Sequence, residues 1–201
     1  MPGNLPVGPF LLWDSPGDDA DISVTLTSAG WRSAGDGILI KNDHPAEPNS
    51  AGLIVFTGTQ GSVAAPANLY VYGDACRWAT TRSRAPVATV DDVVAALAVQ
   101  SSSGTSPPIA VAVGPHPGKA ITLRVPDDVQ LDRCDQGELR YFIEGADNSR
   151  AGYVRGQVDE LWIISAQNAA GRVIFDIVYD DAISAGLVDE LREMVGSATF
   201  K

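Results

Sequence analysis

The sequence predicts an α+β fold that is mainly antiparallel β-sheet, and three observations support this. Most segments alternate apolar and polar residues with a period of two, which is typical of half-buried strands. Only two segments, at about residues 90–99 and 184–195, have the apolar spacing of an amphipathic helix. Turn-forming Gly, Pro, Asn and Asp separate the strands closely, as in a meander. The chain has 201 residues, 45% of them hydrophobic, and we predict one compact domain over residues 1–201.

The first half of the chain is predicted to contain an apolar arm, four strands and a helix. The arm covers residues 5–13, and the strands cover 22–28, 37–41, 52–58 and 68–73. Thr89 is placed to cap the helix, and Asp91 and Asp92 lie in its first turn, where backbone amides favour negative charge. The buried stripe of this helix consists of Val93, Val94 and Leu97.

The second half repeats this pattern with five strands and a final helix. The strands cover residues 109–113, 121–126, 138–145, 159–168 and 172–179, the last two forming a hairpin around 169–171. Ser184 is placed to cap the helix and Gly196 to end it. Its apolar positions are Leu187, Leu191, Met194 and Val195. Residues 197–200 then form a short strand or arm.

The similar order of elements suggests two β-rich pseudo-repeat halves, 14–100 and 109–201. The segment "SSSGTSPP" at 101–108 is low in complexity and is predicted to be the loop that joins them. Sequence identity between the halves is too slight to prove a duplication, so this is a structural hypothesis.

The segment "IAVAVGPHPGKAITL" at 109–123 raises the question of a nucleotide phosphate site. A Walker loop needs four residues between its first Gly and the Gly-Lys pair, but only three separate Gly114 from Gly118, and two of them are prolines without an N–H. Ala120 stands where Ser or Thr should bind magnesium, and a strand pattern follows instead of a helix. We predict a tight turn between two strands, with Gly118 free to take a positive φ, and no cofactor.

Net charge and hydropathy limit the classes of partner that the protein can bind. Twenty-five acidic residues against fourteen basic ones give a net charge of −11 and a pI near 4.4, which disfavours nucleic acid and anionic membrane surfaces. No apolar run reaches the length of a membrane span, and the amino end has neither the basic region nor the cleavage site of a signal peptide. We therefore expect a small molecule or a protein as the partner, with no nucleic acid, and a membrane only through an anchor.

Catalytic and metal motifs are weak. The acidic segment 14–21 lacks the ligand spacing of a calcium loop, and no nucleophile elbow accompanies His44 or His116, which are predicted to be solvent-exposed loop residues. Carboxylates near predicted strand ends are Glu138, Glu144, Asp159 and Glu160. Their spacing defines no catalytic pair. We predict no catalytic residue and no metal site; the alternative is a cell-envelope hydrolase that uses acidic residues.

Bases and aromatic residues concentrate in "YVYGDACRWATTRSR" at 70–84. This segment could make an anion-binding or sugar-stacking surface from three arginines and three aromatic residues: Arg77, Arg82 and Arg84, with Tyr70, Tyr72 and Trp78. Four of these residues, Tyr72, Arg77, Trp78 and Arg82, are our weak ligand-binding candidates. The other interpretation is that the aromatic rings pack in the core while the arginines balance nearby acids.

The two cysteines leave two interpretations open. Cys76 and Cys134 lie 58 residues apart in turn-rich segments, and neither belongs to a metal-binding or redox spacing. A disulfide between them would remove about 4 kcal/mol of unfolded-state entropy in the chain-entropy model. The alternative is two buried thiols in a cytosolic protein.

From about Leu5 to Phe200, the chain resembles a group of actinobacterial extracytoplasmic proteins of unknown function. The segments that carry the resemblance are "LYVYGDACRW", "TVDDVVAALAVQ", "GKAITLRVP", "RCDQGELRYF", "DELWIISAQNAAGRVIFDIVY" and "DELREMVGSATF". The resemblance implies that Cys76 and Cys134 form a disulfide and that the domain follows a membrane anchor, which this sequence lacks. Its motifs are structural, so it implies no active-site residues.

The closing strand, helix and "SATF" are also similar to the PsbP-like α/β sandwich. From these resemblances and the residues together we expect a non-catalytic ligand-binding or sensing domain at the cell surface or secreted. A cytoplasmic location is the alternative.

Overall fold

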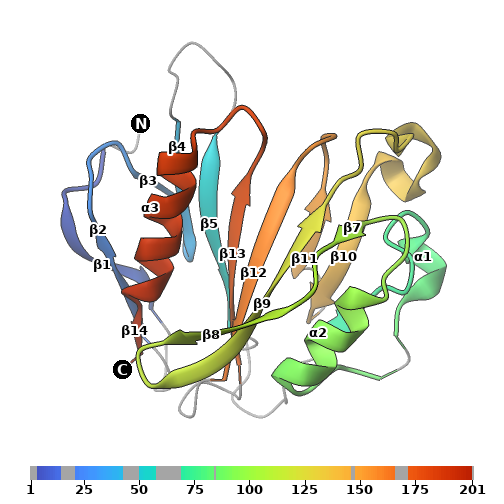
Figure 1. Ribbon diagram of the computed structural model, residues 1–201, viewed down its shortest axis with the longest axis horizontal. Coiled ribbons are helices and arrows are strands. Elements are labelled where there is room, and N and C mark those ends of the chain that lie inside the picture. Colours follow the sequence, from blue (N-terminus) through green and yellow to red (C-terminus); the bar gives the residue numbers. More distant parts are fainter. Residues whose placement is uncertain are drawn as a thin grey trace.

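The computed structural model describes residues 4–14, 21–42, 50–57, 69–83, 85–145, 148–165 and 172–200. It has an α+β fold in which sheet predominates, as predicted (Figure 1). Every pairing between the strands that the structure describes is antiparallel.

The architecture is one large central sheet with two small sheets beside it. The central sheet has the order β3 (Arg32–Gly35), β4 (Ile38–Lys41), β5 (Ala51–Phe56), β13 (Val173–Tyr179), β12 (Val158–Ile164), β9 (His116–Arg124) and β7 (Gly104–Thr105), and β8 (Ile109–Val113) also pairs with β9. One small sheet has the order β1 (Gly8–Trp13), β2 (Ile22–Leu26) and β14 (Thr199–Phe200). The other has the order β11 (Asn148–Gly152), β10 (Leu139–Glu144) and β6 (Leu69–Val71).

Three α-helices lie among the described residues: α1 (Trp78–Thr81), α2 (Val90–Ala98) and α3 (Ala185–Gly196). The predicted N-terminal caps are confirmed, whereas the C-cap of α3 is Ser197 and not Gly196, which is the last residue of the helix. The Thr89 side chain accepts a hydrogen bond from the Asp92 amide, the Asp92 carboxylate accepts one from the Thr89 amide, and Ser184 accepts one from the Leu187 amide. Short 3₁₀ turns at Leu131–Arg133 and Asp135–Gly137 complete the helical elements. Of the helices that the structure describes, none has the length and apolar character needed to cross a membrane.

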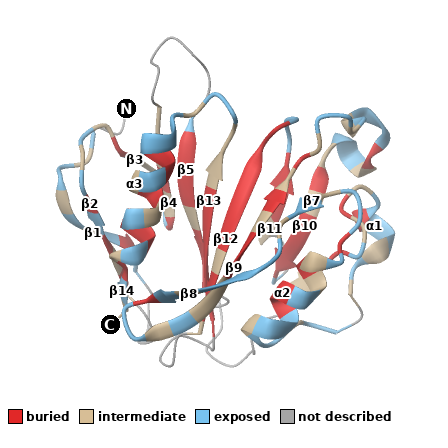
Figure 2. Cartoon of the chain, in the orientation of Figure 1, coloured by how far each residue is buried: buried red, intermediate tan, exposed pale blue. Residues whose placement is uncertain are grey.

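The central sheet is buried on both faces because its strands alternate between two cores (Figure 2). In β13, Phe175 and Ile177 face the core under α3, whereas Ile174 faces the core under the small sheet β11–β10–β6. Figure 1 shows α3 on the side of the central sheet where β3, β4 and β5 lie, with α2 and the small sheet toward the opposite end. Helix α3 contacts β5 and β13. Burial on both faces accounts for the largely apolar sequences of β5 and β13.

Several local predictions need correction. The predicted loop 101–108 contains β7, which pairs with β9, and β3, β11 and α1 were not predicted. Gly114, and not Gly118, takes the positive φ in the turn, at 56°. Gly118 lies within β9, where an added Cβ would collide with the carbonyl oxygen of Ile163 on the neighbouring strand. The predicted turn at 169–171 lies outside the described residues.

Strands from both predicted halves share the central sheet. β5 from the first half pairs directly with β13 from the second, with Gly52 opposite Val178 and Phe56 opposite Ile174. The two halves therefore do not form separate sheets, and their helices cover different parts of one shared layer.

Candidate functional site

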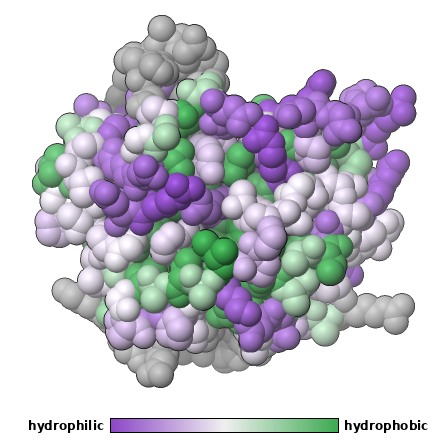
Figure 3. Space-filling view, in the orientation of Figure 1, coloured by the Kyte–Doolittle hydropathy of each residue, from purple (hydrophilic) through white to green (hydrophobic). Residues whose placement is uncertain are grey.

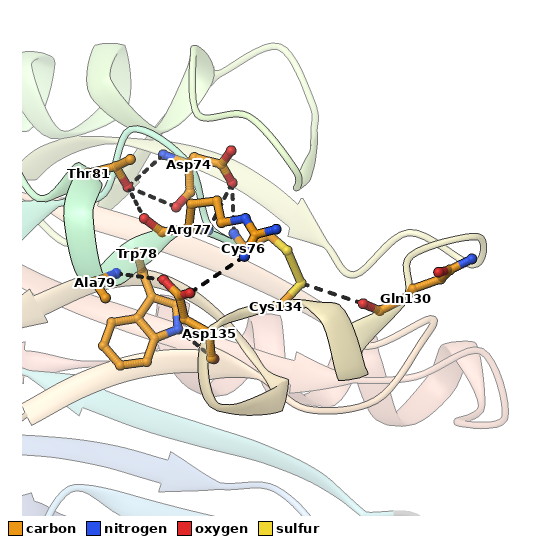
Figure 4. Close-up of a disulfide and its surroundings, with 9 residues drawn as sticks. All are labelled: Asp74, Cys76, Arg77, Trp78, Ala79, Thr81, Gln130, Cys134 and Asp135. Atoms are coloured by element: carbon orange, nitrogen blue, oxygen red, sulfur yellow. Dashed lines mark hydrogen bonds and ion pairs between the residues drawn. A yellow bond between two sulfur atoms is a disulfide. The ribbon is translucent and has the colours of Figure 1, made fainter.

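A disulfide joins Cys76 to Cys134, so the interpretation with two free thiols is wrong (Figure 4). Cys76 lies between β6 and α1, and Cys134 lies between the two 3₁₀ turns, with 4.5 Å between their Cα atoms. The Asp135 amide donates to the Cys76 carbonyl oxygen at 2.9 Å beside the sulfur bridge. Cys134 belongs to the core under the small sheet, so the bond fixes a surface segment to that core.

Two aspartates shape the segment that follows Cys76 (Figure 4). The Asp74 carboxylate accepts hydrogen bonds from the amides of Cys76, at 2.8 Å, and Arg77, at 3.2 Å. The Asp135 carboxylate accepts a hydrogen bond from the Ala79 amide at 3.0 Å. The main-chain carbonyl oxygen of Asp135 accepts one from Trp78 Nε1 at 3.0 Å. Partial burial alone would raise the pKa of Asp74, but these hydrogen bonds and those from neighbouring serines lower it, so the carboxylate holds the turn in its charged form.

The structure gathers the predicted arginine and aromatic candidates in this region. Tyr72 and Trp78 are buried, with ring centroids 6.1 Å apart. The Arg82 guanidinium lies 4.4 Å from the ring centroid of Tyr70, and the Arg77 side chain is 61% exposed, 3.8 Å from Asp135. Arg84 lies outside the described residues.

Arg140, which the sequence analysis did not single out, covers the face of Trp78 at 3.8 Å. Its guanidinium also pairs with Glu138. Arg82 on Tyr70 and Arg140 on Trp78 occupy the ring faces on which a sugar would stack. This geometry matches the packing interpretation better than an open binding surface.

Each carboxylate considered for catalysis is paired with an arginine. The pairs are Glu138 with Arg140, Glu144 with Arg172 at 3.8 Å, Asp159 with Arg150, and Glu160 with Arg192 at 2.7 Å. Trp162 Nε1 also donates to Glu160 at 2.9 Å. An acid held in this way is poorly placed to exchange protons with a substrate.

Asp159 lies in a sealed ionic cluster with Arg150 and Asp176. The guanidinium of Arg150, on β11, contacts carboxylates on β12 and β13, and both aspartate side chains are 0% exposed. Gln157 Nε2 donates to Asp159 at 3.0 Å, and the Tyr141 ring lies against the cluster with its pKa raised, chiefly by burial. Burial likewise raises the pKa of both aspartates, and the charge of Arg150 only partly offsets this. The cluster joins the small sheet to the central sheet and is closed to substrate.

His116 is not the exposed loop residue that the sequence predicted. It begins β9, is half-buried, and its ring packs edge-on against Phe200 with 4.8 Å between centroids. His44, Asp18 and Asp19 lie outside the described residues. Within the described ranges, no group of three His, Cys, Asp or Glu side chains could hold a metal ion.

A cavity of about 500 Å³ lies between the start of α2 and β9. We call it the α2–β9 groove, and its lining residues are Ala88, Thr89, Val90, Asp91, Pro117, Gly118, Lys119 and Ser165. Lys119 Nζ and the Asp91 carboxylate form an ion pair of 2.7 Å at the groove, with side chains 42% and 76% exposed. The Ser165 amide donates to the Pro117 carbonyl oxygen at 2.9 Å, which holds the β9 side of the groove against the end of β12.

The groove is not an anion site. The capping box already provides hydrogen-bond partners at the N-terminus of α2. Asp91 and Asp92 place two negative charges there, and Lys119 is paired with Asp91. The structure thus places the Gly118–Lys119 pair beside a helix start, but one whose charge repels phosphate. The remaining lining is mostly aliphatic, which suits an uncharged or amphiphilic molecule.

A second cavity, of about 310 Å³, lies at the start of α3, and its lining includes Tyr179, Asp181 and Arg192. Arg124 pairs with Asp181 at 2.7 Å, and Arg192 pairs with Asp189 at 3.0 Å as well as with Glu160. Both arginines around this cavity are therefore already engaged by carboxylates of the chain, and we regard the α2–β9 groove as the better candidate.

The sequence analysis missed the groove because its walls come from three distant segments, residues 88–91, 117–119 and 165. Local periodicity identifies each element but not which ones meet. The one feature of the sequence that could have pointed to the groove is Lys119. It is a lone charged residue that follows a segment, Ser101 to Gly118, without any Asp, Glu, Lys or Arg.

No family model matches the chain, and no curated protein matches its sequence. Among solved structures, the chain is similar to a crystal structure from Bacteroides thetaiotaomicron VPI-5482, with 12% sequence identity and a TM-score of 0.38. The match covers 97% of this chain and 48% of the other, so this chain spans about half the length of the one that it matches.

Proposed function

We propose that the protein is a non-catalytic extracytoplasmic domain that binds a small molecule in the α2–β9 groove. The observation that carries this proposal is the groove itself, a cavity of about 500 Å³, which is within the range of small-molecule sites. Ala88, Val90 and Pro117 supply apolar walls, and the Lys119–Asp91 ion pair supplies polar groups at one side. Exposed ion pairs of this kind contribute little to stability, so a ligand can displace one at small cost.

Two features support an extracytoplasmic location. The disulfide between Cys76 and Cys134 is of the kind that persists in oxidising compartments and is rare in the cytosol. The sequence also resembles actinobacterial extracytoplasmic proteins over most of its length. A disulfide-linked domain attached to or released from the cell surface fits both features.

The alternative, a cell-envelope hydrolase, has less support. Asp159 is sealed from solvent and Glu160 is held by Arg192 and Trp162. A general acid needs access to the bond that it protonates, and the pairing of these acids favours a structural role. A binding domain requires no such access.

The test is a ligand screen with a variant that fills the groove. Envelope sugars, short peptides and simple anions would be added to the protein, with thermal shift and amide NMR spectra as readouts. We expect a ligand that perturbs amides of residues 88–91 and 117–119, with binding lost in A88F and kept in A95F, which places the same side chain on the exposed face of α2. Binding that A88F leaves unchanged would overturn the proposal, as would hydrolysis of a ligand that Glu160→Gln abolishes.

A further inference from the structure

Strand β8 is an edge of the central sheet. It pairs with β9 and with no other strand among the described residues. Figure 1 shows the β8–β9 hairpin folded across the lower end of the sheet. The turn between the strands places Gly114 at a φ of 56° before Pro115, as in a two-residue hairpin loop. One long side of β8 is therefore unpaired within the part of the chain that the structure describes.

The unpaired side carries the main-chain groups of Ala110 and Ala112. Ala112 lies opposite Pro117, which has no N–H and whose carbonyl oxygen accepts from Ser165 on the far side of β9. Ala112 thus has no partner on β9, and the two-residue period of antiparallel pairing gives Ala110 the same orientation. Both alanines are exposed, so two donors and two acceptors are accessible along this edge.

This edge also lacks the usual protection against pairing. Edge strands are generally guarded by charged side chains, yet no Asp, Glu, Lys or Arg occurs from Ser101 to Gly118 in a chain of net charge −11. Ile109, the first residue of β8, is 63% exposed. Figure 3 shows hydrophilic residues over α3 and more hydrophobic ones over the lower part of this face, where β8 lies. This edge therefore adds no charge repulsion of its own between two acidic molecules.

The sequence of β8, Ile-Ala-Val-Ala-Val, is complementary to itself. In an antiparallel pair of two copies centred on Val111, Ala110 faces Ala112 of the partner subunit and Ile109 faces Val113 of the partner subunit. Because Ala110 and Ala112 are the two outward-facing residues, this register allows four main-chain hydrogen bonds. The small alanine side chains leave room for close approach, and large residues meet large ones on the other face.

We propose that two copies of the protein associate through β8, antiparallel and about a two-fold axis at Val111, so that their central sheets become continuous. The occupant of the edge is a second copy because the strand matches its own register and carries no charge. A stable interface buries roughly 1,000 Å² or more, and a strand of five residues per chain buries less than this. The dimer is therefore weak and depends on concentration.

The test is sedimentation equilibrium from micromolar to millimolar concentrations, with three variants. In A110K/A112K, lysine faces lysine at both positions of the pair, and we expect a monomer at every concentration. In A110K/A112E, lysine faces glutamate of the partner twice, and we expect the dimer to return, more weakly at high salt. A95K is the matched control with one new charge on the exposed face of α2, and it should dimerise as the wild type does.

Circular dichroism and thermal unfolding check that each variant folds, which is expected because both alanine side chains are exposed in the monomer. A wild-type protein that stays monomeric at millimolar concentration overturns the proposal. A dimer that survives in A110K/A112K does so as well, since another surface must then form it. The groove variant A88F should dimerise as the wild type does. The dimer proposal and the proposal of a ligand in the groove can therefore be overturned independently of each other.

Discussion

On each face of the central sheet, a group of oppositely charged side chains joins the sheet to the layer that covers it. One group is partly exposed to solvent and the other is buried. On the α3 face, Glu190 accepts hydrogen bonds from Trp31 Nε1 at 2.8 Å and Ser28 Oγ at 2.5 Å, and pairs with Lys41 Nζ at 2.9 Å. This group lies near the rim, and the side chains of Lys41 and Glu190 are 16% and 14% exposed.

On the other face, Arg150 lies between Asp159 and Asp176 with no exposed carboxylate at all. Partial burial alone would raise the pKa of Glu190, but hydrogen bonds from Lys41, Ser28 and Trp31 lower it. Complete burial instead raises the pKa of Asp159 and Asp176, because one guanidinium cannot fully compensate two carboxylates. The rim group therefore stabilises the charged carboxylate, whereas the sealed group favours a protonated one.

The largest effect is expected from removing the cation of the sealed cluster. Arg150→Met leaves Asp159 and Asp176 buried without a partner charge, and we expect a loss of about 3–5 kcal/mol in the free energy of unfolding at pH 7. Urea denaturation followed by circular dichroism measures it. Arg133→Met, at an exposed position in a 3₁₀ turn, should change the value by less than about 0.5 kcal/mol.

A second variant separates buried charge from lost packing. In R150M/D159L/D176L the whole cluster is apolar, and a buried ionic group replaced in this way is often neutral or stabilising. We therefore expect the triple variant to recover most of the stability that Arg150→Met loses. A triple variant as unstable as the single one would show that packing, and not charge, dominates at this position.

The disulfide gives the next largest effect, and it acts on the same face as the sealed cluster. Chain entropy sets a ceiling of about 4 kcal/mol for its closed loop, and we expect C76A/C134A to lose about 3 kcal/mol. Amide hydrogen exchange should show where the loss falls, because Cys134 packs in the core under the small sheet. Exchange should accelerate in β6, β10 and α2 and change little in α3; uniform acceleration would mean that the two faces unfold as one unit.

The elements that could be predicted from sequence are those whose signal is local. In β2, Ile22, Val24 and Leu26 alternate with polar residues, and all three are buried. The Thr89 cap and the acidic first turn likewise placed the start of α2 correctly. In each of these elements, burial or capping follows from residues only two to four positions apart.

What could not be predicted depends on residues that meet only in the folded chain. β11, "NSRAG", has no apolar alternation. From its sequence Arg150 resembles a surface residue, and its burial depends on contacts with Asp159 and Asp176 on two other strands. The candidate site has the same difficulty, since Lys119 and Asp91 come together from different elements. The residues alone also left the state of Cys76 and Cys134 open, because spacing does not distinguish a disulfide from two thiols.

The pH dependence of stability is the most direct test of the contrast between the rim and the sealed cluster, because it predicts opposite signs. The raised pKa of Asp176 means that its contribution is present in full below the ordinary value near 3.8 and is lost as pH rises through the folded-state pKa. Relative to Asp176→Asn, the wild type should therefore lose stability from about pH 4 toward neutrality. The lowered pKa of Glu190 means that its contribution is present above the ordinary value near 4.5 and is lost as pH falls.

Relative to Glu190→Gln, the wild type should therefore lose stability below about pH 4.5. The size of each difference follows the size of the pKa change, since one unit of pKa corresponds to about 1.4 kcal/mol. Urea denaturation of the three proteins from pH 3 to pH 8 gives both curves. Slopes of the same sign would mean that water reaches both carboxylates alike, and the distinction between a rim ion pair and a sealed cluster would then fail.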